Sequence, residues 1–249
     1  MLTEQTIDIM RSLRLTGMLE ALEEQYKMPK INDLSFDERL GLLIDAERCH
    51  RENKRLLRYH RAAKFRYSQA CIEDVDYAPR RKLAKSVVLQ LASCRWIKEH
   101  QNVIVTGATG VGKSYLACAL GVQACRKGYK TIYRRAPRLF DELALAHADG
   151  TFTRLLNQFA KTDLIIIDDF GMSPIKAAER RDLLEIIEDR DNTRSTIVAG
   201  QLPADDWYDY LNEPTTADAI CDRLIHNSHK IELKGPSKRK ELALKKKKD

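Results

Sequence analysis

Residues 102–120 read NVIVTGATGVGKSYLACAL. Four β-favouring residues, 103–106, run directly into the loop GATGVGKS, and helix-forming residues follow at once. The spacing GxxxxGK[ST] between a strand and a helix is the phosphate-binding P-loop. Glycines let backbone N–H groups approach phosphate oxygens, and the helix N-terminus adds unpaired donors and the positive end of its dipole. The stretch therefore predicts a nucleotide site.

The residue types of this loop predict ATP and Mg²⁺ as cofactors. Lys113 is expected to neutralise the β- and γ-phosphates, and the Ser114 hydroxyl to bind Mg²⁺. The residues expected to contact ATP are Gly107, Ala108, Thr109, Gly110, Val111, Gly112, Lys113, Ser114 and Tyr115.

A second motif, LIIIDD at residues 164–169, lies about fifty residues downstream. Four consecutive aliphatic residues are typical of a central parallel strand that is buried on both faces. Its two acids lie where open α/β sheets bind ligands. Asp168 is expected to hold Mg²⁺ through its water shell, and Asp169 to orient or polarise the attacking water. Gln201, after the strand 195–199, is expected to reach that water or the γ-phosphate.

The remaining segments predict an α/β fold with a five-stranded parallel sheet flanked by helices. A pair of helices, 137–148 and 152–160, precedes the third strand. Further helices are expected at 177–190 and 217–226. The five strands are expected at 103–106, 130–133, 164–169, 195–199 and 230–233.

The N-terminal region is expected to be helical over 2–28 and over about 36–66. The second half of the second helix is basic, with Glu52 as its single acid. Like charges at i,i+4 repel, so a nearly one-signed face indicates a polyanionic partner. We expect this face to contact the phosphates of double-stranded DNA with little sequence preference. The expected DNA-binding residues are Arg48, Arg51, Lys54, Arg55, Arg58, Arg61 and Lys64, with Arg134 and Arg135 as a second candidate surface.

Composition and charge set the domain organisation. The chain has 249 residues, a hydrophobic share of 43% and a net charge of +7. We expect a helical domain at 1–75, an ATPase domain at 76–234 and a basic tail at 235–249.

No apolar run is long enough to span a membrane, and the N-terminus does not resemble a secretory signal. Six scattered cysteines without a CxxC pair indicate reduced thiols and a cytoplasmic protein.

These motifs, in this order, resemble the AAA+ ATPases, and the paired helices resemble the initiator and helicase-loader branch that includes DnaA and DnaC. From residue 13 to about 239, the chain is most similar to IstB-like proteins, the ATP-binding helpers encoded beside the transposase of bacterial insertion sequences. The supporting stretches are LRLTGMLEAL at 13–22, LSFDERLGLLIDA at 34–46, DDFG at 168–171 and AICDRLIH at 219–226.

The resemblance implies a homo-oligomer that assembles on DNA with ATP, regulates the transposase and associates with the bacterial nucleoid. Arg223 matches the arginine finger that reaches the γ-phosphate of a neighbouring subunit. Arg239 lies near the family's last arginine, although the local sequence GPSKRK departs from the usual pattern. Asp169 stands where a glutamate is commonest in the wider superfamily, which implies slow hydrolysis.

Two other functions remain open. A helicase loader would need an amphipathic helix that docks on its helicase, whereas a DNA clamp needs a broad basic surface such as residues 48–66. A metabolic P-loop kinase would need an acceptor site and a lid, for which the sequence offers no residues. A neighbouring transposase gene would distinguish the transposition helper from the loader.

Overall fold

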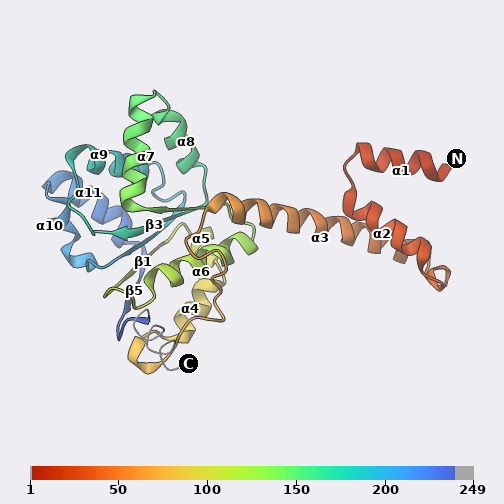
Figure 1. The fold of residues 1–249 in the computed structure, drawn as a ribbon, viewed down its shortest axis with the longest axis horizontal. Coiled ribbons are helices and arrows are strands. Elements are labelled where there is room, and N and C mark those ends of the chain that lie inside the picture. Colours follow the sequence, from red (N-terminus) through yellow and green to blue (C-terminus); the bar gives the residue numbers. More distant parts are fainter. Residues whose placement is uncertain (1, 239–249) are drawn as a thin grey trace, which may run out of the picture. The chain divides into compact units, whose positions relative to one another are not determined.

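A computed structural model describes residues 2–238. The chain divides into two compact units, Met1–Arg58 and Tyr59–Asp249. The division falls inside a long helix, α3 (Phe36–Ala63). Figure 1 shows the order of the elements along the chain.

The first unit is entirely helical among its described residues. It contains α1 (Leu2–Ser12), α2 (Thr16–Lys27), the 3-10 turn η1 (Ile31–Asp33) and most of α3. The expected single helix over 2–28 is broken, because Arg14 adopts a left-handed conformation with φ 58°.

Close backbone approach holds α2 against α3. A Cβ added at Gly17 would lie 2.5 Å from the Cβ of His50, so only glycine fits there. The Glu47 carboxylate on α3 accepts the N–H of Met18 at 3.0 Å and thereby satisfies a donor at the start of α2. The interior of this small unit is therefore partly polar.

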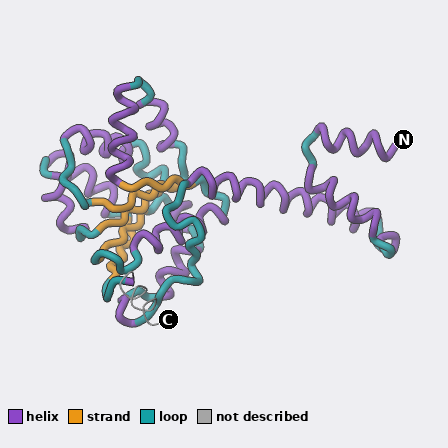
Figure 2. The backbone as a smooth tube through the Cα atoms, viewed as in Figure 1, coloured by secondary structure: helices purple, strands orange, loops and turns teal. Residues whose placement is uncertain are grey.

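The second unit is built on a parallel sheet, whose predicted five strands are confirmed (Figure 2). The spatial order is β2-β3-β4-β1-β5. The strands are β1 (Asn102–Gly107), β2 (Thr131–Arg135), β3 (Leu164–Phe170), β4 (Ser195–Gly200) and β5 (Ser228–Leu233). Because all strands run in one direction, their carboxyl ends meet at one edge of the sheet.

Each face of the sheet has its own hydrophobic core. Val103 and Ile166 belong to the core that includes the P-loop helix α6 (Lys113–Arg126). Ile104 and Ile167 point into the opposite core, as side chains alternate along a strand. The helices that contribute to that second core are α7 (Ala136–Ala148), α8 (Phe152–Ala160), α9 (Ala177–Glu188), α10 (Trp207–Leu211) and α11 (Pro214–Ile225).

The stretch 59–75 belongs to the second unit, whereas the expected boundary lies between residues 75 and 76. The reason is apolar packing: Ala63, Phe65 and Ile72 are buried in the core beside α6. Along the chain, this stretch is followed by η2 (Pro79–Arg81), α4 (Lys85–Ala92) and α5 (Arg95–Lys98), and then by the first strand of the sheet.

The segment 235–238, expected to begin a tail, is packed on the P-loop. The guanidinium of Arg81 donates to the carbonyl of Pro236, and the N–H of Lys238 donates to the carbonyl of Gly110 at 2.9 Å. Arg239 and the lysine run at 245–248 lie outside the described residues.

The described helices include none with the length and apolar character needed to cross a bilayer. The six cysteines are free thiols. Burial raises the pKa of Cys94, Cys118 and Cys125 to about 11, so these thiols stay protonated.

Candidate nucleotide-binding site

A cavity of about 420 Å³ opens at the carboxyl edge of the sheet. Eight residues expected at the nucleotide line it: Thr109, Gly110, Gly112, Lys113, Ser114, Tyr115, Asp169 and Gln201. Residues that the sequence did not nominate for this site also line it, among them Arg66, Tyr67, Asp74, Arg135, Met172 and Lys238. Val111 is instead buried in the core at 2% exposure.

The loop geometry depends on glycine at two positions. Gly107 has φ 140°, and a Cβ there would lie 2.1 Å from the carbonyl oxygen of Leu233. Gly112 has φ 116° and directly precedes α6. The Lys113 ammonium donates to the carbonyls of Gly107 at 2.7 Å and Ala108 at 2.9 Å. The ammonium group that is expected to bind the β- and γ-phosphates is therefore already held at the P-loop.

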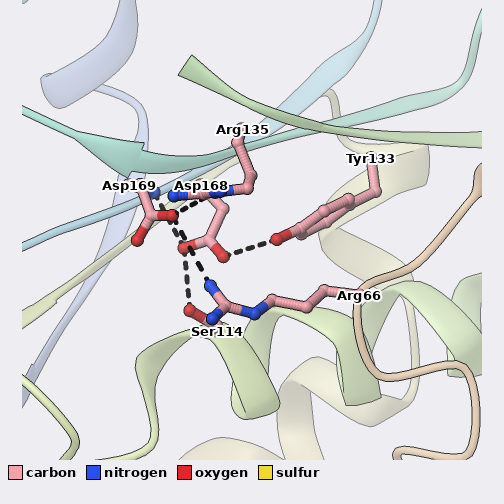
Figure 3. A network of polar contacts seen from close by, with 6 residues as sticks. All are labelled: Arg66, Ser114, Tyr133, Arg135, Asp168 and Asp169. Atoms are coloured by element: carbon pink, nitrogen blue, oxygen red, sulfur yellow. Dashed lines mark hydrogen bonds and ion pairs between the residues drawn. The ribbon is translucent and has the colours of Figure 1, made fainter. Parts of the chain in front are cut away.

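Asp168, expected at the metal, is 1% exposed and held from two sides. Its Oδ1 accepts the Ser114 hydroxyl at 3.1 Å, and its Oδ2 accepts the Tyr133 hydroxyl at 2.7 Å (Figure 3). Burial, and then the Asp168 charge, raises the pKa of Tyr133, so this phenol stays protonated and donates. The carboxylate is thereby fixed facing the first turn of α6.

Asp169 reaches the cavity because the strand is irregular at that point. The β3–β4 register shifts between Ile167 and Phe170, and Asp169 adopts φ 57°, which aspartate tolerates better than most residues. Its Oδ2 lies 2.6 Å from Nε of Arg135 and 3.5 Å from Nη1 of Arg66. The carboxylate expected to act on water is thus paired with two guanidinium groups.

Two further contacts involve residues that line the cavity. The Thr109 hydroxyl donates to Oε1 of Gln201 at 2.8 Å, which links the P-loop to the end of β4. The rings of Tyr67 and Tyr115, which also line the cavity, lie 5.9 Å apart, and the Tyr115 hydroxyl accepts the N–H of Cys71 at 3.4 Å. This aromatic pair has the apolar character that suits a nucleobase.

Three of the predicted site residues have partners of their own. Arg223 donates to the carbonyl of Ala219 at 3.0 Å and pairs with Glu188 at 3.1 Å. Among the described residues, Arg223 does not line the nucleotide cavity. Arg134 forms a two-point pair with Glu142, at 2.6 and 3.2 Å. Arg135 turns into the cavity, although it was nominated for DNA.

The predicted DNA-binding residues on α3 differ in their surroundings. Arg48 pairs with Asp45 at 3.1 Å, and Arg51 pairs with Glu47 at 2.6 Å. All seven are exposed, including the other five, Lys54, Arg55, Arg58, Arg61 and Lys64. Lys64 follows α3 with φ 57°.

Sequence reasoning missed Arg66 in the pocket and the buried Tyr133 behind Asp168, and it assigned Arg135 to another surface. A usable signal existed for Arg135, because it ends a parallel strand, and ligands bind at the carboxyl ends of such strands. Tyr133 reaches Asp168 through the pairing of β2 with β3, which residue types alone do not specify. Arg66 offered no signal, since it continued the basic pattern of the preceding helix.

The parallel sheet, the P-loop and the acids at the end of β3 define a P-loop nucleotide-binding protein of AAA+ architecture. Solved structures support this class. The chain is similar to AMPPCP-bound DnaA from Aquifex aeolicus, with a TM-score of 0.56, 20% identity, and coverage of 72% of this chain and 55% of that chain. It is also similar to the DnaC helicase loader, with a TM-score of 0.57, 18% identity, and coverage of 68% and 99%.

The family follows from sequence comparison. The model of the IstB-like ATP-binding proteins matches residues 9–247. An insertion-sequence putative ATP-binding protein of Pseudomonas fluorescens is 50% identical, over 82% of this chain and 88% of that protein. A putative ATP-binding protein in an insertion sequence of Mycobacterium tuberculosis is 35% identical, over 92% of each. This chain belongs to the family of IstB-like ATP-binding proteins, which confirms the resemblance drawn from its motifs.

Proposed function

We propose that this protein is a Mg²⁺-dependent ATPase that assembles on double-stranded DNA and assists the transposase of its own insertion sequence. The observation that carries the proposal is the pairing of Ser114 with Asp168 at 3.1 Å, with Asp169 beside them in the cavity. Relatives named as insertion-sequence ATP-binding proteins support the biological setting.

The donor set fits a magnesium ion. Hydroxyl and carboxylate oxygens are the ligands that Mg²⁺ prefers, and Ser114 and Asp168 present both to the same point. When bound, the ion would neutralise charge on the β- and γ-phosphates. The chain's own residues do the rest: Lys113 binds the phosphates, Tyr133 and Ser114 orient Asp168, and Asp169 orients the attacking water.

Residues outside the catalytic carboxylates have distinct proposed roles. Gln201, tied to Thr109, senses the γ-phosphate or the water from the end of β4. Arg223 completes the site of a neighbouring subunit, which agrees with its position outside the cavity of its own chain. Hydrolysis therefore depends on homo-oligomer formation.

DNA contact is assigned to the basic part of α3. Lys54, Arg55 and Arg61 are exposed cations on one helix, and phosphate contacts by such residues position a protein without specifying sequence. Arg134 and Arg135 are the weaker candidates, because both already pair with carboxylates. Such a protein would work in the bacterial cytoplasm, at the nucleoid.

A helicase loader is the second candidate, and it is favoured by the likeness to the DnaC helicase loader. The experiment that separates the two uses the full chain with its neighbouring transposase. Transposition helper activity predicts ATP-dependent assemblies on duplex DNA and stimulated strand transfer, both lost in Lys113→Ala. Loading of a replicative helicase without any effect on the transposase would overturn the proposal.

A further inference from the structure

Arg66 is fixed beside the P-loop helix by the residues around it. The preceding Phe65 is buried at 8% exposure, and its ring packs at Gly121 of α6, where an added Cβ would lie 2.6 Å from Cε1. Lys64, the residue after α3, has φ 57°, so the chain turns away from the helix axis at this point. The base of the Arg66 side chain therefore cannot move far from α6.

The guanidinium of Arg66 lies at the proposed metal site. Nη1 is 3.5 Å from Oδ2 of Asp169, and the side chain is only 33% exposed. Figure 3 shows this group pointing toward the carboxylates of Asp168 and Asp169. The two carboxylates belong to consecutive residues, so a cation close to them offsets their repulsion.

We propose that Arg66 is a resident cation of the metal site beside Arg135: it helps to neutralise the carboxylates when no metal is bound and competes with Mg²⁺ for them. The inference rests on the proposed metal site. Arg66 lies at the Asp169 carboxylate, adjacent to the Ser114 and Asp168 oxygens proposed for Mg²⁺, so the two cations repel each other. The compact divalent ion has the stronger Coulomb attraction to the carboxylates. Metal binding therefore releases Arg66 from Asp169, and Arg66 supports metal-free ATP binding by screening the carboxylates from the phosphates.

The test compares nucleotide binding with and without metal. A non-hydrolysable ATP analogue is titrated into the full chain by calorimetry, once in EDTA and once in excess MgCl₂. In Arg66→Gln, we expect affinity in EDTA to fall by about 10- to 100-fold, the range for a lost charged contact. The affinity of Arg66→Gln for the nucleotide in MgCl₂ should differ from that of the wild type by less than about threefold. The ratio of affinity with metal to affinity without metal is therefore larger in Arg66→Gln than in the wild type. Arg66→Lys should lie between Arg66→Gln and the wild type.

A second measurement needs no nucleotide. Mn²⁺, followed by electron paramagnetic resonance, should bind Arg66→Gln about 10-fold or more tightly than the wild type, because its competitor is gone. Arg66→Met, which keeps the aliphatic stem, should behave like Arg66→Gln. Arg126→Gln is the matched control: it removes the same charge from an exposed position in the last turn of α6 and should match the wild type in both measurements.

Two failures are distinguishable. If the wild type shows metal enhancement but Arg66→Gln and Arg66→Met leave both the enhancement and Mn²⁺ affinity unchanged, Arg66 is a structural ion pair and this inference is overturned alone. If the wild type itself shows neither metal enhancement nor Mn²⁺ binding, the proposed metal site falls, and the inference with it.

Discussion

At the scale of single residues, Lys113 gives the most direct test of the nucleotide site. Its ammonium is held by the carbonyls of Gly107 and Ala108, 2.7 and 2.9 Å away, at the base of the cavity. Lys113→Ala should lower ATP affinity by at least about 100-fold, because a charged contact to phosphate is lost. Calorimetric titration measures this, with the exposed Lys127→Ala on the same segment as control. Equal ATP affinity in Lys113→Ala and the wild type would refute the P-loop assignment.

Asp169 is the residue whose role in hydrolysis can be separated from binding. Asp169→Asn keeps the size of the side chain but loses the charge, so ATP affinity should stay within about threefold while turnover falls by about 10²-fold or more. Single-turnover phosphate release measures the chemical step. The exposed Asp209→Asn serves as control. Unimpaired turnover in Asp169→Asn would mean that another group positions the water.

Residue roles were predictable where a motif fixes them and not where folding brings them together. The positions of Lys113, Ser114, Asp168 and Asp169 follow from two short motifs. The pairing of Asp169 with Arg135 does not, because it joins the ends of two strands whose alignment depends on the whole sheet.

At the scale of elements, the basic part of α3 is expected to supply DNA affinity. Each phosphate contact contributes about 0.9 to the slope of log K against log salt. Replacing Lys54, Arg55 and Arg61 with alanine should therefore flatten that slope by roughly two to three units, equally for unrelated duplexes. ATP binding should survive, since none of the three lines the cavity. Fluorescence anisotropy over one salt range provides the measurement.

The matched comparison is the pair Arg134→Ala and Arg135→Ala. These arginines already have carboxylate partners, at 2.6 Å each, so their replacement should leave the salt slope within about half a unit. If the salt slope is unchanged in the α3 variant but smaller in the Arg134→Ala and Arg135→Ala variant, DNA binds at the second surface and not at α3.

The loop around Asp76 predicts a pH effect on stability. The N–H of Ala78, and then the guanidinium of Arg81, lower the pKa of Asp76 to about 2, against the opposing effect of burial. A carboxyl with a depressed folded pKa stabilises the protein above its unfolded pKa, about 3.9, and this stability is lost as pH falls toward 2.

Asp76→Asn should therefore lower the free energy of unfolding at pH 7 by about 2 kcal/mol. The deficit relative to the wild type should shrink as pH is lowered from 5 toward 2.5. Urea unfolding at several pH values measures it, with Glu73→Gln as the neighbouring control. A deficit that is independent of pH would show that the charge of Asp76 is not the cause.

Element types were predictable, and element ends were less so. Periodicity correctly indicated the helix pair α7 and α8, because Asp149 and Gly150 interrupt it. It missed the break at Arg14 and the end of α3 before Lys64. Both residues adopt positive φ, and neither arginine nor lysine favours that conformation by itself. Tertiary packing imposes these ends, so residue-level preferences do not reveal them.

At the scale of the whole molecule, Arg223 tests whether activity needs more than one subunit. Arg223→Ala should bind ATP normally but hydrolyse it at least about tenfold more slowly, a smaller loss than the ~10³–10⁵ known for the arginine fingers of GTPases. Mixing it with Lys113→Ala should restore part of the activity, because some interfaces then combine an intact finger with an intact pocket. Turnover is measured across mixing ratios on DNA. Absence of recovery at every ratio would argue against a role between subunits.

The strand order has a consequence for how the protein is made. β1, which leads into the P-loop, hydrogen-bonds to β4 and β5, and both are far downstream in the chain. At ~5–20 residues per second, a ribosome finishes β5 roughly 6 to 25 s after β1. During that interval β1 has two unpaired edges, the condition that invites aggregation. The nucleotide site is thus among the last features of the newborn chain to form, and a truncated product has none.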